Sequence, residues 1–282
     1  MTFLGIYREP EYSPGRHTSN DAQILRLVSQ ALENFGVEVR LASLEEARTL
    51  WEDADLIFSM CQGPQALAEL SEWKKQGARI LNDPAGSRKT YRESLCRTLT
   101  HLTLPFPRSA ALATDGSVDL ARYKTFFQTH GAWLKRADVH ATQPSDVVRV
   151  KQWQDLPFAL ELFHVRGLQQ AILQEHVEGD EVKFYAVQGG AFFWPYYPKD
   201  CVGHPFDEVL LQKMAEDAAQ TLGVSVYGGD AIISPSGTIT LIDLNDWPSF
   251  APCRGAAAFS IAHFLKESYV TQNRRAAAAP HK

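Results

Sequence analysis

The sequence has few cysteines and no long apolar run. The four cysteines are Cys61, Cys96, Cys201 and Cys253. They lie far apart and form no CxxC pair, which excludes a disulfide-stapled domain and a cysteine zinc site. No stretch approaches the roughly 20 apolar residues that a membrane-spanning helix requires. The first 15 residues carry acids and proline where a signal peptide has a basic flank and an apolar core. We therefore expect a cytoplasmic protein without membrane contact.

Basic residues are also few, and they are scattered. The 282 residues include 28 Lys and Arg against 33 Asp and Glu, which gives a net charge of -5. Nucleic-acid binding needs a basic stripe, and none is present. The nine histidines lack zinc-ligand spacing, and no Ser/His/Asp or Cys/His arrangement is evident. We expect no nucleic-acid partner; the oligomeric state is left open.

What remains is an ordinary globular composition, with 45% hydrophobic and 22% charged residues. Residues 1–85 predict a small parallel α/β lobe, because short apolar runs alternate with segments of helical periodicity. The predicted strands are 2–7, 37–41, 55–60 and 79–81, and the predicted helices are 20–34 and 64–75. Loops 7–17 and 61–64 then follow strand ends and face a cleft.

The rest of the chain divides into a central lobe (residues 86–176) and a C-terminal lobe (residues 177–270). Helical character over 86–104 ends at Pro105 and Pro107, since each proline removes an amide donor. Strands are predicted at 132–135, 170–176, 181–187 and 191–194, then a helix at 207–222, strands at 224–233 and 238–244, and a helix at 256–270. We expect residues 271–282 to be a flexible tail.

Three polar residues on the last two predicted strands carry the clearest functional signal. A tight turn at residues 235–237 pairs these strands, so Asp230 and Asp243 can lie opposite each other, with Asn245 on the same face as Asp243. Facing carboxylates repel unless a cation lies between them, and all-oxygen ligands suit Mg2+ or Mn2+. The alternative is a solvated hairpin with surface acids. If these residues hold a metal, Asp243→Asn should abolish turnover. Because the variant removes the repulsion between the carboxylates, it should also slightly raise the metal-free melting temperature.

An acid on one strand, Asp-x-Asn on the next and a following Pro248 resemble the metal-binding signature of the ATP-grasp superfamily. The resemblance implies an α/β (α+β) fold, in which a parallel α/β lobe precedes two lobes that enclose the nucleotide. It also implies that Asp230, Asp243 and Asn245 hold magnesium on the ATP phosphates. The chain length and motif are similar to the glutathione-synthase-like and peptide-tailing ligases, and the metal motif is similar to the inositol phosphate kinases.

The segment from Leu173 to Val187 is similar to the superfamily's interlobe hinge and the strand after it. By this resemblance Glu175 and Val177 flank the adenine, Glu178 accepts the ribose hydroxyls, and Lys183 reaches the phosphates. The alternative is an exposed charged strand.

Trp133-Leu-Lys135 resembles the strand whose lysine contacts the α and β phosphates. Arg92 occupies the place of a second phosphate-binding lysine, with Arg88, Lys89 and Arg97 as competitors. The segment after Lys135 departs from the superfamily pattern, because residues 137–143 contain no glycine. The superfamily has a glycine-rich loop here that closes over the phosphates. The candidates to replace that loop are His140, Thr142 and Gln143; the alternative is a loop that is shorter and less mobile.

The resemblance implies an ATP- and Mg-dependent ligase that activates a small-molecule or peptide carboxylate as an acyl phosphate for attack by an amine. The alternatives are a kinase of a hydroxylated substrate such as an inositol phosphate, and a nucleotide-binding regulator without catalysis. Lys135, Lys183 and Arg254 are the candidate catalytic residues. Arg254 is placed to clamp a carboxylate or phosphate of the substrate, or else it is a structural ion-pair partner.

Overall fold

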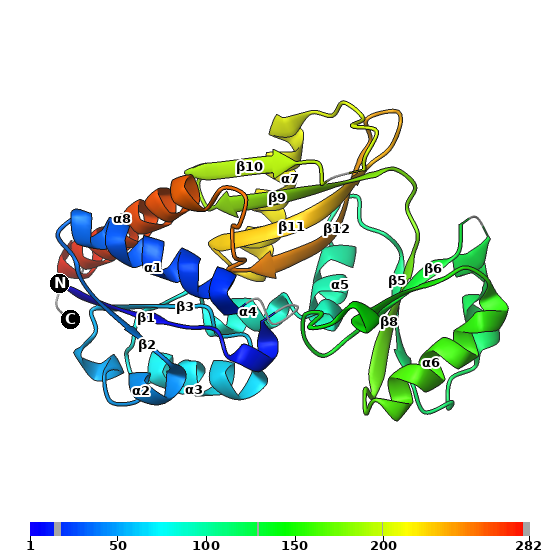
Figure 1. Cartoon of the computed structure of the whole chain (residues 1–282), viewed down its shortest axis with the longest axis horizontal. Coiled ribbons are helices and arrows are strands. Elements are labelled where there is room, and N and C mark those ends of the chain that lie inside the picture. The colour runs from blue at the N-terminus through cyan, green and yellow to red at the C-terminus, as the bar shows by residue number, and fades with distance from the viewer. Residues whose placement is uncertain (14–17, 129, 199, 279–282) are drawn as a thin grey trace.

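The computed structural model opens with a four-stranded parallel sheet in the order β2-β1-β3-β4 (Figure 1). The structure describes residues 1–13, 18–128, 130–198 and 200–278. The strands are β1 (Thr2–Ile6), β2 (Glu38–Ala42), β3 (Leu56–Ser59) and β4 (Ile80–Leu81). Residues 14–17 of the predicted cleft loop lie outside the described residues.

Helices cover both faces of this sheet. Alternate residues of β1 point to opposite faces, so Phe3 packs beneath α1 (Thr18–Asn34) while Leu4 and Ile6 pack toward α2 (Leu44–Ala47) and α3 (Pro64–Lys75). A run of buried apolar side chains on both sides of β1 explains why the strand is nearly continuous in hydrophobic residues.

Two linker helices, α4 (Pro84–Lys89) and α5 (Arg92–Thr100), lead to the central sheet, which is antiparallel in the order β5-β8-β6-β7. Its strands are β5 (Ser109–Ala113), β6 (Ala132–Arg136), β7 (Val147–Val150) and β8 (Gln170–Glu175), with α6 (Leu156–Val165) packed on one side. Strands β5 and β7 and helix α6 were not predicted from the sequence. Short 3-10 helices complete the connections: Pro10–Tyr12, Trp51–Asp53, Leu120–Phe127, Pro144–Asp146 and Trp153–Asp155.

The third sheet is antiparallel in the order β10-β9-β11-β12. Its strands are β9 (Asp180–Val187), β10 (Phe192–Tyr196), β11 (Val226–Ile233) and β12 (Ile239–Asp246). Helix α7 (Glu208–Leu222) packs on this sheet together with α5, which contributes Leu95 and Leu99 to the same core. Asp207 caps α7 by accepting from the Leu210 amide, and Gly223 ends it at a φ of 85°.

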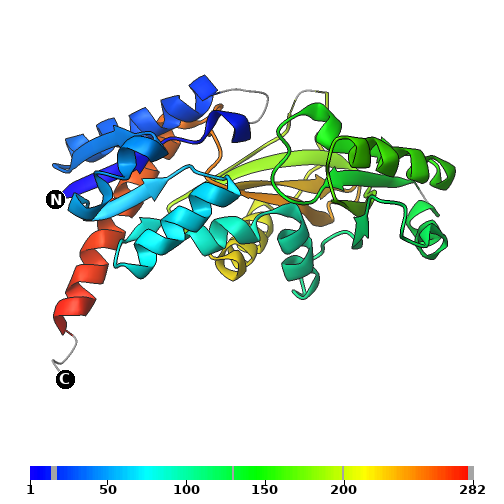
Figure 2. The same cartoon turned by 90° about the horizontal axis from the view of Figure 1, so that it is seen from below.

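The last helix, α8 (Arg254–Ala278), packs mainly on α1 and also contacts β9 of the third sheet. Residues 271–278 belong to this helix, although a flexible tail was expected there, and residues 279–282 lie outside the described residues. Figure 2 shows the end of α8 projecting past the N-terminal sheet. Among the described residues, none of the helices has the length and apolarity needed for a membrane crossing.

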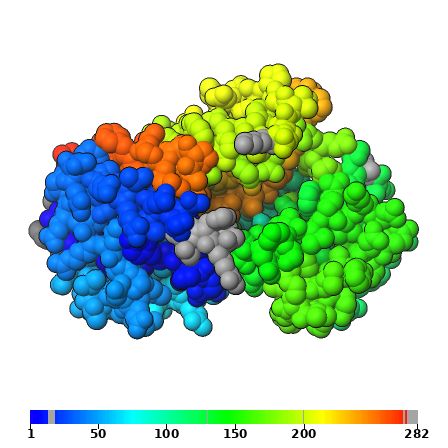
Figure 3. All heavy atoms as spheres, viewed as in Figure 1, coloured from blue at the N-terminus to red at the C-terminus, as the bar shows by residue number. Residues whose placement is uncertain are grey.

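The three sheets form an elongated molecule in which the N-terminal sheet and the central sheet lie at opposite ends (Figures 1 and 3). The third sheet connects the two ends along one side. The mixed α/β fold class predicted from the sequence is confirmed.

Candidate active site

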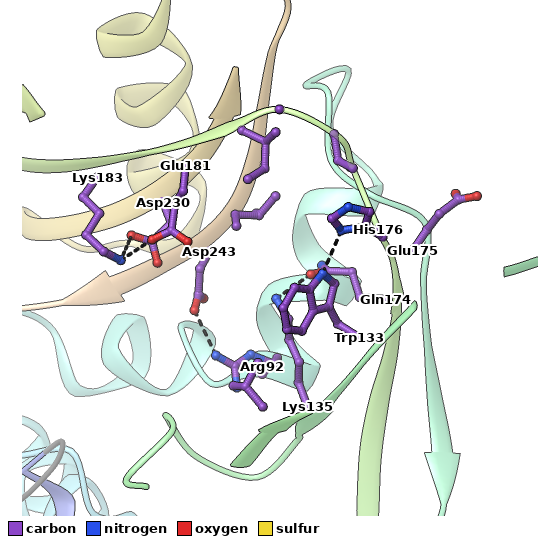
Figure 4. A pocket seen from close by; sticks show the side chains of 15 residues that line it. Arg92, Trp133, Lys135, Gln174, Glu175, His176, Glu181, Lys183, Asp230 and Asp243 are labelled. Carbon is purple, nitrogen blue, oxygen red and sulfur yellow. Dashed lines mark hydrogen bonds and ion pairs between the residues drawn. The ribbon is translucent and has the colours of Figure 1, made fainter. Parts of the chain in front are cut away.

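Two adjoining cavities lie where the three sheets meet. The first, called the hinge cavity, has a volume of about 350 Å³ and lies between the central and third sheets; Figure 4 shows its lining. The second, called the lobe-junction cavity, has a volume of about 420 Å³ and extends to the N-terminal lobe. Both volumes fall in the range of small-molecule sites. The residues that line both cavities are Arg92, Lys183, Asp230 and Asp243.

The two aspartates at this junction lie directly opposite each other. Asp230 of β11 pairs in register with Asp243 of β12, and Gly228 pairs with Asn245. The register shifts after Asp230, which marks an irregularity in the strand pair at this point. The sequence prediction of two facing carboxylates is therefore confirmed in register. Asn245 lines the lobe-junction cavity beside them.

Each aspartate has its own cationic partner. Lys183 Nζ lies 2.9 Å from Asp230 Oδ1 and 2.6 Å from Glu181 Oε1. Burial opposes the charge on Lys183, but Asp230 and Glu181 raise its pKa above the usual value. Arg92, the first residue of α5, donates from Nη2 to Asp243 Oδ2 at 2.9 Å. Figure 4 shows Lys183 and Arg92 approaching the carboxylates from different elements.

Lys135 lies deeper, on β6. Its side chain is buried, and Nζ donates to Gln174 Oε1 at 2.6 Å. Burial, together with the nearby Arg92, lowers the pKa of Lys135. A cation held in this way is stabilised when an anion enters the cavity. The structure thus brings together five of the predicted charged residues around one space: Arg92, Lys135, Lys183, Asp230 and Asp243.

The opposite end of the hinge cavity is apolar and aromatic. Its walls are Trp133, Val147, Val177, Ile232 and Ile242. Trp133 Nε1 donates to His176 Nδ1 at 3.1 Å, and the Arg149 guanidinium lies 5.1 Å from the Trp133 ring centroid. These contacts fix a flat aromatic wall next to the β8–β9 connection.

The fold has known counterparts. Neither a protein-family model nor a curated protein matches this sequence. Among solved structures, the chain is similar to the D-alanine--D-alanine ligase from Bacillus anthracis complexed with ATP, with a TM-score of 0.74, 10% identity and coverage of 98% of this chain and 99% of that one. This chain has the ATP-grasp fold.

Two further solved structures have a fold similar to that of this chain. The D-alanyl-alanine synthetase A from Vibrio cholerae O1 biovar eltor has a TM-score of 0.73 at 13% identity and covers 95% of this chain and 98% of that one. The VanG D-Ala:D-Ser ligase from Enterococcus faecalis has a TM-score of 0.73 at 14% identity, with coverage of 95% and 99%. At these identities the likeness concerns the fold.

One residue of the predicted hinge lies outside the hinge cavity. Glu175 and Val177 line the hinge cavity. Glu175 Oε2 lies 3.6 Å from Arg108 Nε, and the side chain is directed away from the charged end (Figure 4). Glu178 does not line it. Its exposed carboxylate lies 2.9 Å from His130 Nδ1. Glu181, two residues before Lys183, lines the cavity instead.

Arg254 was predicted to clamp the substrate, and the structure gives it a different position. It lines neither cavity. Its guanidinium donates to Gln23 Oε1 at 2.6 Å and to Asn20 Oδ1 at 3.1 Å, and Nε lies 3.5 Å from the Ser249 carbonyl. Arg254 therefore fixes two lining residues of the lobe-junction cavity, Asn20 and Ser249, and joins α8 to α1.

Several lining residues were not assigned from the sequence. Arg8 is buried and donates to the carbonyl oxygens of Met60 at 3.2 Å and Trp247 at 2.6 Å, which ties the β1 loop to the end of β12. Gln62 donates to Asp246 Oδ1 at 2.8 Å. These contacts join residues up to 239 positions apart, and no local pattern signals them. Asp246 had one signal, its place directly after the Asp-x-Asn motif.

Proposed function

We propose that this chain is an ATP- and Mg-dependent ligase, which activates a small-molecule or peptide carboxylate as an acyl phosphate for attack by an amine. One observation carries the proposal: the facing carboxylates of Asp230 and Asp243 lie where the hinge cavity meets the lobe-junction cavity. This placement gives one space for a nucleotide and a second space for an acceptor, with the phosphate site between them. The ATP complex of the Bacillus anthracis ligase, which shares the fold, supports the choice of nucleotide.

The residues present fit both groups. Asp230, Asp243 and Asn245 offer oxygen ligands only, which suit Mg2+ and also Mn2+. The apolar walls at Val177 and Ile232 suit a purine ring, whereas a phosphate chain suits the cationic end. When bound, the metal neutralises charge on the transferring phosphoryl group.

The side chains of the protein position the phosphates and neutralise their negative charge. Lys135, Lys183 and Arg92 surround the junction from β6, β9 and α5, so an anion there meets three cations fixed before binding. Fixed cations lower the cost of reorganisation during phosphoryl transfer. No side-chain nucleophile is required, because the acceptor oxygen attacks directly.

A kinase acting on a hydroxyl group is the alternative, since the same cations serve both reactions. A regulator without catalysis is less well supported, because all three metal ligands border the cavities. The test incubates the protein with ATP, Mg2+ and single or paired carboxylates, amines and polyols. Release of ADP together with a product in which two substrates are joined with loss of water supports a ligase. A product that has gained phosphate supports a kinase.

Melting experiments test nucleotide binding alone. ATP should raise the melting temperature weakly without a divalent ion and clearly with Mg2+, because only the folded protein binds the complex. An unchanged melting temperature at millimolar ATP and Mg2+ would refute nucleotide binding.

A further inference from the structure

The segment that follows Lys135 folds inward and does not form a glycine-rich flap. Buried Asp146 accepts hydrogen bonds from the backbone amides of Thr142 at 2.9 Å and Gln143 at 3.3 Å. These amides are therefore directed at a carboxylate of their own loop. Of the described residues in this segment, His140 and Ala141 line the lobe-junction cavity. The one ionisable side chain that this loop offers to the cavity is thus His140.

The protein contacts of the His140 imidazole assign its proton. Nε2 lies 3.0 Å from Thr90 Oγ1. The single proton of the Thr90 hydroxyl is donated to the Ser87 carbonyl at 2.6 Å, so Oγ1 can only accept from His140. Nε2 therefore carries a proton in the neutral ring, and Nδ1 carries a lone pair. The Tyr91 ring packs edge-on against the imidazole, with centroids 6.1 Å apart, and holds this orientation.

A buried carboxylate lies behind the protonated nitrogen. Asp246 Oδ1 is 3.7 Å from His140 Nε2, and the Asp246 side chain is almost fully buried. Gln62 also donates to Oδ1, while Oδ2 has no hydrogen-bond partner among the described residues. A carboxylate in this position stabilises a positive charge on the imidazole.

Nδ1, by contrast, has no hydrogen-bond partner among the described residues. It is also not one of their fully buried polar atoms that lack a partner, so it keeps some exposed surface. Because His140 borders the cavity that also contains Asn245, this lone pair is available to a molecule bound beyond the phosphate site.

We propose, on the basis of the ligase function proposed above, that His140 is a catalytic residue that accepts a proton from the attacking amine. The nitrogen lone pair of the neutral amine forms the C–N bond at the acyl carbon, and the C–O bond to phosphate breaks with its electron pair on the phosphate. The N–H proton passes to Nδ1, which leaves an imidazolium beside Asp246. That proton then transfers to the departing phosphate, and His140 returns to its neutral form.

The experiment separates acyl phosphate formation from amine capture. Wild-type protein is incubated with ATP, Mg2+ and each common L- or D-amino acid, singly and in pairs, with and without hydroxylamine. ADP, hydroxamate and amide products are measured. Hydroxylamine is a weakly basic nucleophile that is mostly neutral at pH 7, so its capture depends little on a general base.

His140→Gln is the informative variant, because its amide nitrogen can still donate to Thr90 while no basic lone pair replaces Nδ1. We expect amide formation to fall about 100-fold and hydroxamate formation by less than about threefold. His164→Gln is the matched control. His164 Nδ1 lies 3.4 Å from Thr114 Oγ1, and this hydroxyl donates to a backbone carbonyl as the Thr90 hydroxyl does. His164 lines neither cavity. This control should change neither product.

The outcomes are distinguishable. Equal losses of amide and hydroxamate in His140→Gln, or no loss of amide, would overturn the role of His140 while the ligase function stands. A wild-type protein that yields neither ADP nor hydroxamate with any member of the panel would overturn the ligase proposal and this role with it.

Discussion

Asp230 and Asp243 lie directly opposite each other, but their carboxyl groups differ in pKa. Burial raises the pKa of Asp230 to about 6; Lys183 opposes the shift, and Asp243 adds to it. Burial acts in the same direction on Asp243, but Arg92 and Lys135 outweigh it, and its pKa is lowered. Asp243 is therefore a firmly held anion, whereas the charge on Asp230 is disfavoured without a further cation.

Asp230→Asn should stabilise the metal-free protein. An acid whose pKa is raised by folding binds more protons in the folded state, so stability falls as pH rises from the unfolded pKa to the folded one. Removal of this charge should add roughly 1–3 kcal/mol to the free energy of unfolding above pH 6. The gain should shrink below about pH 6 and vanish near pH 4.

Urea unfolding in the presence of a chelator, at several pH values, measures this difference. A variant that is less stable than wild type at neutral pH would show that the Lys183 contact outweighs burial at Asp230.

Asp243→Asn should have the opposite effect on stability. Facing carboxylates alone predict a slightly higher metal-free melting temperature, and the structure reverses that expectation. Arg92 is buried and pairs with Asp243 at 2.9 Å, so the variant loses a charged hydrogen bond, at a cost of roughly 1–3 kcal/mol. Turnover of ATP should also fall by about 100-fold or more.

Asp217→Asn, at an exposed acid on α7, is the matched control and should change neither quantity. Melting without metal and ADP production with metal are the two measurements. Full activity in Asp243→Asn would refute the metal site.

Glu178 and Glu181 give a paired test of the hinge. Glu181 lines the hinge cavity and contacts Lys183, whereas Glu178 is exposed and contacts His130. Glu181→Gln should therefore raise the KM for ATP about 10-fold, which corresponds to about 1.4 kcal/mol. Glu178→Gln should leave it unchanged. Steady-state kinetics measure the KM for ATP in both variants. A raised KM in Glu178→Gln with an unchanged KM in Glu181→Gln would restore Glu178 as the residue that accepts the ribose hydroxyls.

The strand pairing that carries the metal motif could be predicted from the sequence for a physical reason. A tight turn at Gly237 fixes the register, and alternation then places Asp230 opposite Asp243. The cations that face them are harder to predict. Arg92 lies 151 residues from Asp243, and only the tertiary fold brings them together.

Other long-range contacts could not be predicted for the same reason. Helix α8 follows the third sheet in sequence, and its apolar residues share a core both with Ile24 of α1 and with Val226 of that sheet. Arg254, its first residue, donates to Gln23 and Asn20 of α1, contacts that span more than 230 positions. His140 and Asp246 are 106 positions apart, and no spacing rule links them.

Lys135 offers the most direct test of the phosphate site. Its ammonium group is buried with Gln174 as its hydrogen-bond partner, and burial lowers its pKa. An empty cavity therefore holds this charge at a cost, which an anionic ligand offsets. Lys135→Met keeps the length and apolar volume of the side chain and removes the charge. We expect the unliganded variant to melt no lower than wild type, while most of the melting shift caused by ATP and Mg2+ is lost.

Lys151→Met, at an exposed position just after β7, is the matched control and should keep the full shift. If Lys135→Met responds to ATP and Mg2+ as wild type does, the phosphates bind elsewhere, and the assignment of the hinge cavity to the nucleotide is wrong.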